Sequence, residues 1–74
     1  MKFLRAYDNG TTADRYAVIF DDGIFAMTEN ADLSDGCCIY YGTNYNEKYL
    51  GKLIAFDDLP AGTRKKIKNL EGGL

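Results

Sequence analysis

Short apolar runs, rich in β-branched and aromatic residues, alternate along this chain with polar clusters of Gly, Asn and Asp. Such runs between turn-forming residues are typical of β-strands. The pattern predicts strands over residues 2–7, 16–20, 24–28, 37–41 and 49–56. Because turns or short loops separate successive strands, we expect a mainly antiparallel meander of four to five strands.

The dipeptide Asp22-Gly23 lies between two of these runs and predicts a two-residue hairpin turn, because both central positions of that turn need a positive φ. In the resulting register Phe20 lies opposite Phe25, and Val18 lies opposite Met27. Residues that share a face then form the expected core side of the hairpin, which consists of Tyr16, Val18, Phe20, Phe25 and Met27. The other side is also apolar, so we expect something to cover it; it carries Ala17, Ile19, Ala26 and Thr28.

Helical spacing replaces the strand pattern near the end of the sequence. Asp57-Asp58-Leu59-Pro60 combines an acidic cap with a proline in the first turn, and Gly72-Gly73 ends the helix. One narrow apolar stripe recurs at helical spacing, at Leu59, Thr63, Ile67 and Leu70. The predicted fold class is therefore α+β, a small antiparallel four- to five-stranded sheet (meander) with one C-terminal helix packed on a sheet face.

The chain has 74 residues, which predicts a single domain over residues 1–74 with a small core. A core of this size supplies only about 3–5 kcal/mol, so a disulfide, a metal or a second subunit usually adds stability. The sequence contains no histidine, and its two cysteines are the neighbours Cys37 and Cys38. Neighbouring strand residues point to opposite faces, which disfavours a bridge, and the pair falls short of a structural zinc site. We expect both to be buried strand residues; a vicinal disulfide or a redox switch is the alternative.

Targeting signals are absent from the sequence pattern. The N-terminal residues lead into Tyr7-Asp8-Asn9-Gly10 and not into an apolar run, so we expect no signal peptide. No stretch approaches the roughly 20 apolar residues that span a bilayer, so no membrane partner is expected. Unbridged cysteines agree with a reducing compartment, and the expected location is the cytoplasm.

Residues with catalytic chemistry are scarce. Histidine is missing, as are a nucleophile elbow and the glycine-rich loops that cradle phosphates. The acidic pairs Asp21-Asp22 and Asp57-Asp58 fit turn and cap positions better than a metal-binding or catalytic pair. The sequence therefore predicts that the protein is not an enzyme and uses no metal and no cofactor.

Charge is distributed unevenly along the chain. Residues 1–47 carry three basic and eight acidic side chains, residues 48–74 carry six basic and three acidic ones, and the net charge is −2. The basic side chains Arg64, Lys65, Lys66 and Lys68 form either a solvated helix face that complements the helix C-terminus or a phosphate-binding patch. A net acidic chain disfavours duplex DNA as a partner, and a charge this small disfavours a DNA mimic.

Four tyrosines, Tyr40, Tyr41, Tyr45 and Tyr49, fall within ten residues. Strand alternation lets one of the first two enter the core, so at least two of the four are expected to be partly exposed. Exposed tyrosines suit protein interfaces and stacking on bases, and the alternative is packing around a small core. The candidate binding residues are Tyr40, Tyr41, Tyr45, Tyr49, Lys52, Arg64 and Lys65.

Self-association is the remaining source of stability, and we expect a homo-oligomer, most simply a two-fold dimer. The predicted helix covers only one sheet face. The other face, with Ala17, Ile19 and Ala26, or the tyrosine cluster beside it, is then left for a second copy.

Two segments, Asp14–Phe20 (DRYAVIF) and Leu50–Pro60 (LGKLIAFDDLP), resemble a group of small phage- and prophage-encoded proteins of unassigned function. The resemblance spans residues 14–70, with looser matches at Met27–Asn30 and Tyr41-Gly42. It departs from the group between Asn30 and Gly36, where the group has a shorter, proline-bearing loop. These motifs are strand and cap residues, so the resemblance implies a fold and no catalytic residues.

Phage origin implies an inhibitor of a host defence system that acts by stoichiometric binding in the host cytoplasm. In one version the surface from Tyr40 to Tyr49 and the acidic loop from Glu29 to Asp35 bind a basic groove of a host effector protein. In the other, tyrosines of an oligomer pocket stack on a nucleotide signal, and Arg64, Lys65 or Lys52 holds its phosphate. The alternative is a structural, assembly or accessory component of a phage particle or regulatory complex. A DNA-binding regulator ranks third, because one short helix provides no helix-turn-helix.

Overall fold

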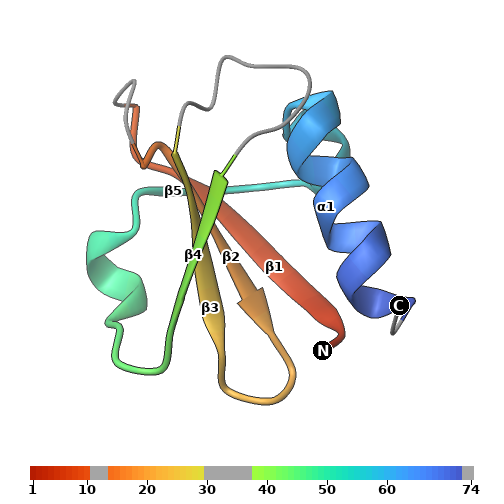
Figure 1. The fold of residues 1–74 in the computed structure, drawn as a ribbon. Helices are drawn as coiled ribbons and strands as arrows, with labels where there is room; N and C mark the ends of the chain where they lie inside the picture. The colour runs from red at the N-terminus through yellow and green to blue at the C-terminus, as the bar shows by residue number, and fades with distance from the viewer. Residues whose placement is uncertain (11–13, 30–37, 73–74) are drawn as a thin grey trace.

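Five strands form at the apolar runs of the sequence. The computed structural model describes residues 1–10, 14–29 and 38–72, with the backbone alone at 29 and 38–40. The strands are β1 (Phe3–Asp8), β2 (Tyr16–Phe20), β3 (Phe25–Glu29), β4 (Cys38–Gly42) and β5 (Lys52–Ile54) (Figure 1). They pair antiparallel in the order β4-β3-β2-β1-β5. The first four strands form the predicted meander, and β5 returns to pair with β1 at the opposite edge.

The fifth strand is shorter than the predicted run over residues 49–56. Two 3-10 turns, η1 (Glu47–Tyr49) and η2 (Phe56–Asp58), occupy its two ends. Gly51 stands just before β5 with a φ of +102°. This conformation suits glycine and interrupts an extended strand, so only residues 52–54 join the sheet.

The single helix of the described residues, α1 (Ala61–Glu71), begins later than the sequence predicts. Its N-cap is Pro60, and Asp58 Oδ2 instead accepts the backbone N–H of Ala55 at 3.1 Å, within η2. The predicted acidic cap of α1 is therefore wrong. The apolar stripe is confirmed, because Thr63 and Ile67 are fully buried. The predicted small α+β fold, an antiparallel sheet with one C-terminal helix, is confirmed. No helix in the described part of the chain is long and apolar enough to cross a membrane.

The β2–β3 hairpin has a different register from the predicted one. Val18 pairs with Ala26, and the N–H of Phe20 donates to the carbonyl of Ile24 at 2.9 Å. The loop therefore contains three residues and ends at Gly23, whose φ is +82°. A turn followed by a left-handed glycine is a common three-residue hairpin connection. The positive φ at Gly23 is confirmed, and the two-residue loop is wrong.

The shift of one residue turns β3 over, because strand side chains alternate between faces. Phe25 and Met27, predicted on the same side as Phe20, pack on the opposite face. Ala26 takes the place predicted for them. The core beneath α1 consists of Ala6, Tyr16, Val18, Phe20, Ala26, Leu59 and Ile67.

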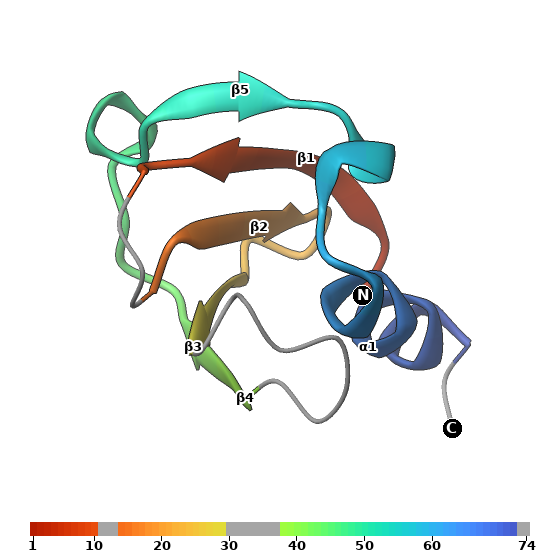
Figure 2. The ribbon, with the colours of Figure 1, turned by 90° about the horizontal axis from the view of Figure 1, so that it is seen from above.

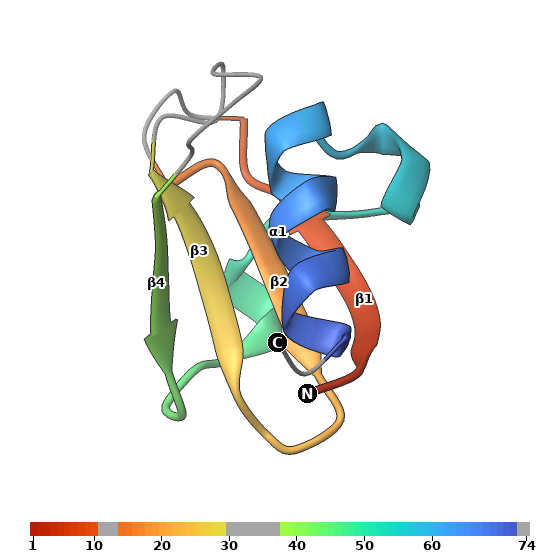
Figure 3. The same ribbon diagram turned by 45° about the vertical axis from the view of Figure 1, so that its right-hand side comes forward.

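The second sheet face is covered by the connection between β4 and β5. This connection crosses the face opposite α1, as the two rotated views show (Figures 2 and 3). Its Leu50 is buried with Ala17 and Ile19. The centroid of its Tyr45 ring lies 5.0 Å from the centroid of the Phe25 ring. Ala17 and Ile19 are at most 1% exposed within one subunit. The expectation that this face is left for a second copy is therefore wrong.

Candidate binding surface

The connection is fixed to the sheet by a carboxylate at the start of η1. Arg5 Nε donates to Glu47 Oε2 at 2.7 Å, and its Nη2 donates to Oε1. The hydroxyl of Tyr7 donates to Oε2 as well. Arg5 and Tyr7 are two residues apart on β1 and so present their side chains on one sheet face. Glu47 therefore ties η1 to the middle of β1.

These hydrogen bonds change the acidity of the groups involved. The hydrogen bond from Arg5, followed by that from Tyr7, lowers the pKa of Glu47 to about 2. The hydrogen bond to Glu47, and then burial, raise the pKa of Tyr7 above its ordinary value. Donors to a carboxylate favour its charged form. Glu47 is therefore ionised over the whole neutral range.

Two further contacts fix η1, one at its start and one at its end. Asn46 Oδ1 accepts the backbone N–H of Lys48 at 3.1 Å and caps the turn. Leu50 is only 8% exposed. At Gly51 the chain approaches β1 so closely that a Cβ would lie 2.4 Å from the carbonyl oxygen of Asp8.

Between these anchors the aromatic ring of Tyr49 points into solvent. Tyr49 is 79% exposed, although Leu50 beside it is buried. Leu53 of β5 is 59% exposed, and its pairing with Tyr7 places it on the same side of the sheet as η1. We call Lys48, Tyr49 and Leu53, which are all exposed, the η1 surface.

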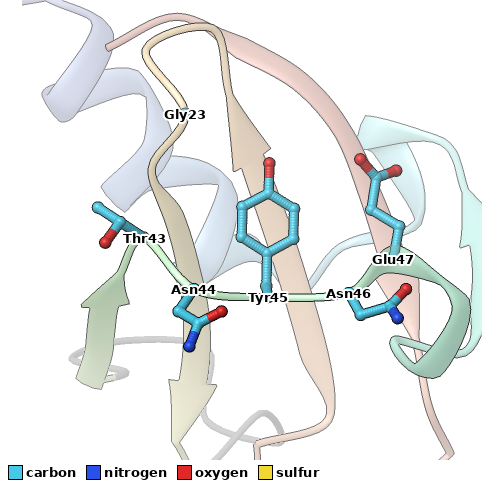
Figure 4. Close-up of a pocket in the computed structure, with 6 residues that line it drawn as sticks. All are labelled: Gly23, Thr43, Asn44, Tyr45, Asn46 and Glu47. Carbon is cyan, nitrogen blue, oxygen red and sulfur yellow. The ribbon is translucent and has the colours of Figure 1, made fainter.

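The four candidate tyrosines do not form one cluster. Tyr45 is half-buried and lines an open depression of about 860 Å³, together with Gly23, Thr43, Asn44, Asn46 and Glu47 (Figure 4). Tyr41 is 52% exposed, and its pairing with Ala26 places it on the α1 side of the sheet. Tyr40 has only its backbone described, and Tyr49 belongs to the η1 surface. The expectation of at least two partly exposed tyrosines is confirmed, on opposite sides of the sheet.

Two of the three candidate cations lie apart from the exposed tyrosine of η1. Arg64 and Lys65 are on α1, across the sheet from the connection that carries Tyr49. Lys52 pairs with Asp8 across β5 and β1. One subunit therefore does not bring Arg64 and Lys65 together with Tyr49, and a nucleotide site that uses all three needs more than one subunit.

A second ion pair, which the sequence reasoning missed, fastens the β1–β2 connection. Arg15 donates from Nε and Nη2 to the two oxygens of Asp8 at 2.8 and 2.9 Å. Asp8 Oδ1 also accepts the N–H of Gly10 at 2.8 Å. The hydrogen bonds from Arg15 lower the pKa of Asp8, with a smaller contribution from Gly10. A carboxylate and an arginine that flank one predicted loop are the signal that could have indicated this pair.

The acidic turn residues bind the backbone, as predicted. Asp21 Oδ1 accepts the N–H of Lys2 at 2.9 Å, and Asp22 Oδ1 accepts that of Ile24 at 3.2 Å. Among the described residues no three His, Cys, Asp or Glu side chains are grouped to hold a metal ion. Cys37 and residues 30–35 of the predicted acidic loop lie outside the described residues.

Comparison with known proteins gives no relative. No protein-family model, no curated protein and no solved structure matches this chain. The resemblance to small phage-encoded proteins therefore stays a prediction.

Proposed function

We propose that this chain is a non-enzymatic, phage-type binding protein that inhibits a host effector protein by stoichiometric occupation of its surface. The observation that carries the proposal is the exposure of Tyr49 on a turn that is fixed at both ends. Tyrosine, with tryptophan and arginine, is enriched among the residues that dominate the binding energy of protein interfaces when a partner pocket encloses them.

The anchors of η1 make that exposure useful for binding. Glu47 is held by Arg5 and Tyr7, and Leu50 is buried two residues before β5. The backbone around Tyr49 is therefore already in one conformation before a partner arrives. Binding then loses little backbone entropy, and the aromatic ring loses few rotamers.

We favour a protein partner for the η1 surface over a nucleotide site that uses Arg64 and Lys65. Tyr49 and Leu53 are large exposed side chains on one side of the sheet, whereas the cations Arg64 and Lys65 are on the other. A nucleotide signal needs phosphate ligands beside the stacking ring, and next to Tyr49 the η1 surface offers Lys48 in place of the predicted Arg64 and Lys65. An apolar pocket with a hydrogen-bond acceptor for the tyrosine hydroxyl matches this surface.

The two carboxylates held by arginines also favour binding over catalysis. A general acid or base at neutral pH needs a pKa near 7. The pKa of Glu47 is about 2, and that of Asp8 is lowered by Arg15. Both groups stay ionised near pH 7 and serve the fold.

Affinity capture from a bacterial lysate tests the proposal with three tagged chains: the unchanged protein, Tyr49→Ser and Tyr41→Ser. Tyr41 is a matched control, because it is also an exposed tyrosine but lies on the other side of the sheet. We expect a partner held one-to-one by the unchanged protein and by Tyr41→Ser, and lost from Tyr49→Ser.

Native mass spectrometry of the purified chain accompanies the capture. A nucleotide retained by the unchanged protein, with no protein captured, would replace effector binding by nucleotide sequestration. Capture that survives Tyr49→Ser unchanged would refute the η1 surface as the binding site.

A further inference from the structure

The sheet has two edge strands, and they differ in how they are protected. β5 contains only three residues, begins with Lys52 and follows the positive-φ Gly51. Short length and a lysine are common devices that stop an edge from pairing with another chain. β4 has neither device, since it contains five residues without a charge or a proline.

The edge of β4 that faces away from β3 is regular and extended. All five of its residues pair with β3 in an unshifted antiparallel register, from Phe25 opposite Gly42 to Glu29 opposite Cys38. In the sheet order of residues 1–10, 14–29 and 38–72 no strand lies beyond β4. Its outward backbone N–H and C=O groups therefore lack a strand partner among the described residues. Such a regular row of groups accepts a further antiparallel strand.

The absence of charge in β4 indicates which kind of strand can pair with it. The sequence from Cys38 to Asn46 carries no charged side chain, in a chain with a net charge of −2. Two copies of β4 can therefore approach edge to edge without bringing like charges together. A strongly acidic or basic partner segment would find no complementary charge there.

We infer that β4 is the edge through which two copies of this chain pair, antiparallel and about a two-fold axis. Residue 40 then stands opposite residue 40 of the second copy, and residue 38 opposite residue 42. The two five-stranded sheets join into one sheet of ten strands. A two-fold contact is closed, because the same patch serves both copies.

This interface also covers exposed apolar surface. Tyr41 is 52% exposed although it belongs to the sheet. A paired strand brings side chains of the second copy beside it, and aromatic cross-strand pairs stabilise a sheet. The inference is independent of the η1 surface, which lies on the other side of the sheet.

Light scattering over a concentration series tests the pairing with Tyr41→Lys and the control Tyr49→Lys. A lysine on an edge strand opposes pairing. In this register position 41 stands opposite position 39 of the second copy, so the two introduced charges would be diagonal neighbours across the two-fold axis, about 7–8 Å apart. We expect the unchanged protein and Tyr49→Lys to reach twice the chain mass of 8.3 kDa. Tyr41→Lys stays at the single mass while circular dichroism shows that it is folded.

Hydrogen exchange of the unchanged protein provides a second test that needs no variant. Protection of the β4 amides rises with protein concentration if β4 pairs, and protection of the β5 amides does not. A single mass at every concentration overturns the inference, as does a dimer that survives Tyr41→Lys. Equal exchange of β4 at low and high concentration overturns it even if Tyr41→Lys fails to fold.

Discussion

Replacement of Gly51 by alanine is the most direct test of how the connection is fixed to the sheet. The φ of Gly51 is +102°, and an alanine Cβ there would lie 2.4 Å from Asp8 O and 2.6 Å from Asn9 Cα. A positive φ costs an L-residue about 1–2 kcal/mol. Overpacking against backbone that has to move adds about 1–3 kcal/mol. Alanine also lowers the conformational entropy of the unfolded chain, and this offsets up to about 1 kcal/mol of the lost stability.

The net expectation for Gly51→Ala is a loss of about 3 kcal/mol, within bounds of about 1–5 kcal/mol, which is a large part of the roughly 3–5 kcal/mol that one small core supplies. Gly23→Ala is the matched control, because Gly23 has a φ of +82° and an alanine Cβ there would meet nothing within 4 Å beyond its chain neighbours. It should lose only about 1 kcal/mol, from the backbone conformation alone. Urea denaturation followed by circular dichroism measures both variants. Equal midpoints for the two would refute the close approach of Gly51 to β1.

Three further predictions concern other parts of the fold. Phe20→Ala removes a ring that is 1% exposed and should cost about 3–5 kcal/mol, so the variant loses its cooperative thermal transition. Asp58→Ala removes the 3.1 Å hydrogen bond to Ala55 and should lower the free energy of unfolding in urea by about 1 kcal/mol, with Asp57→Ala as the control. For Glu47 the folded pKa of about 2 lies below the ordinary 4.5, so its contribution to stability is complete above pH 4.5 and is lost as the pH falls toward 2. Acid titrations of melting temperature should therefore show a smaller loss over that window for Glu47→Gln than for the unchanged protein, and parallel curves would contradict the ion pair with β1.

Local patterns account for the parts of the fold that could be predicted from the sequence. Each strand overlaps an apolar run bounded by turn residues, and the α1 stripe at Thr63 and Ile67 is buried as its spacing indicates. The start of α1 was less predictable. Asp58 is a good cap for any turn, and the sequence does not say whether η2 or α1 uses it.

The faces of β3 depended on a single loop residue. Asp22-Gly23 is compatible with a two-residue turn and with a three-residue loop that includes Asp21. The structure has the longer loop, and Phe25 therefore lies on the face opposite Phe20. Both faces of β3 are apolar, so the hydrophobic pattern could not correct the error.

The candidate site depended on contacts between distant residues. Arg5 and Glu47 are 42 positions apart, and no local pattern brings them together. Sequence reasoning selected Tyr49 because it is one of four tyrosines within ten residues. Its exposure, however, depends on the hydrogen bonds that Arg5 and Tyr7 donate to Glu47 and on the burial of Leu50. No sequence pattern indicates either of these.

The covered second face changes where a small domain of this kind can find additional stability. A connection that passes from β4 to β5 has to cross the whole sheet, since the two strands form opposite edges. In crossing, it buries Ala17 and Ile19 without a second subunit. The same route adds no strand to either edge of the described sheet, because a chain that crosses a face does not pair with the strand at either side. The second copy that we infer would therefore meet the sheet at an edge and not on its covered face, and the uncharged β4 is the edge that we propose for it.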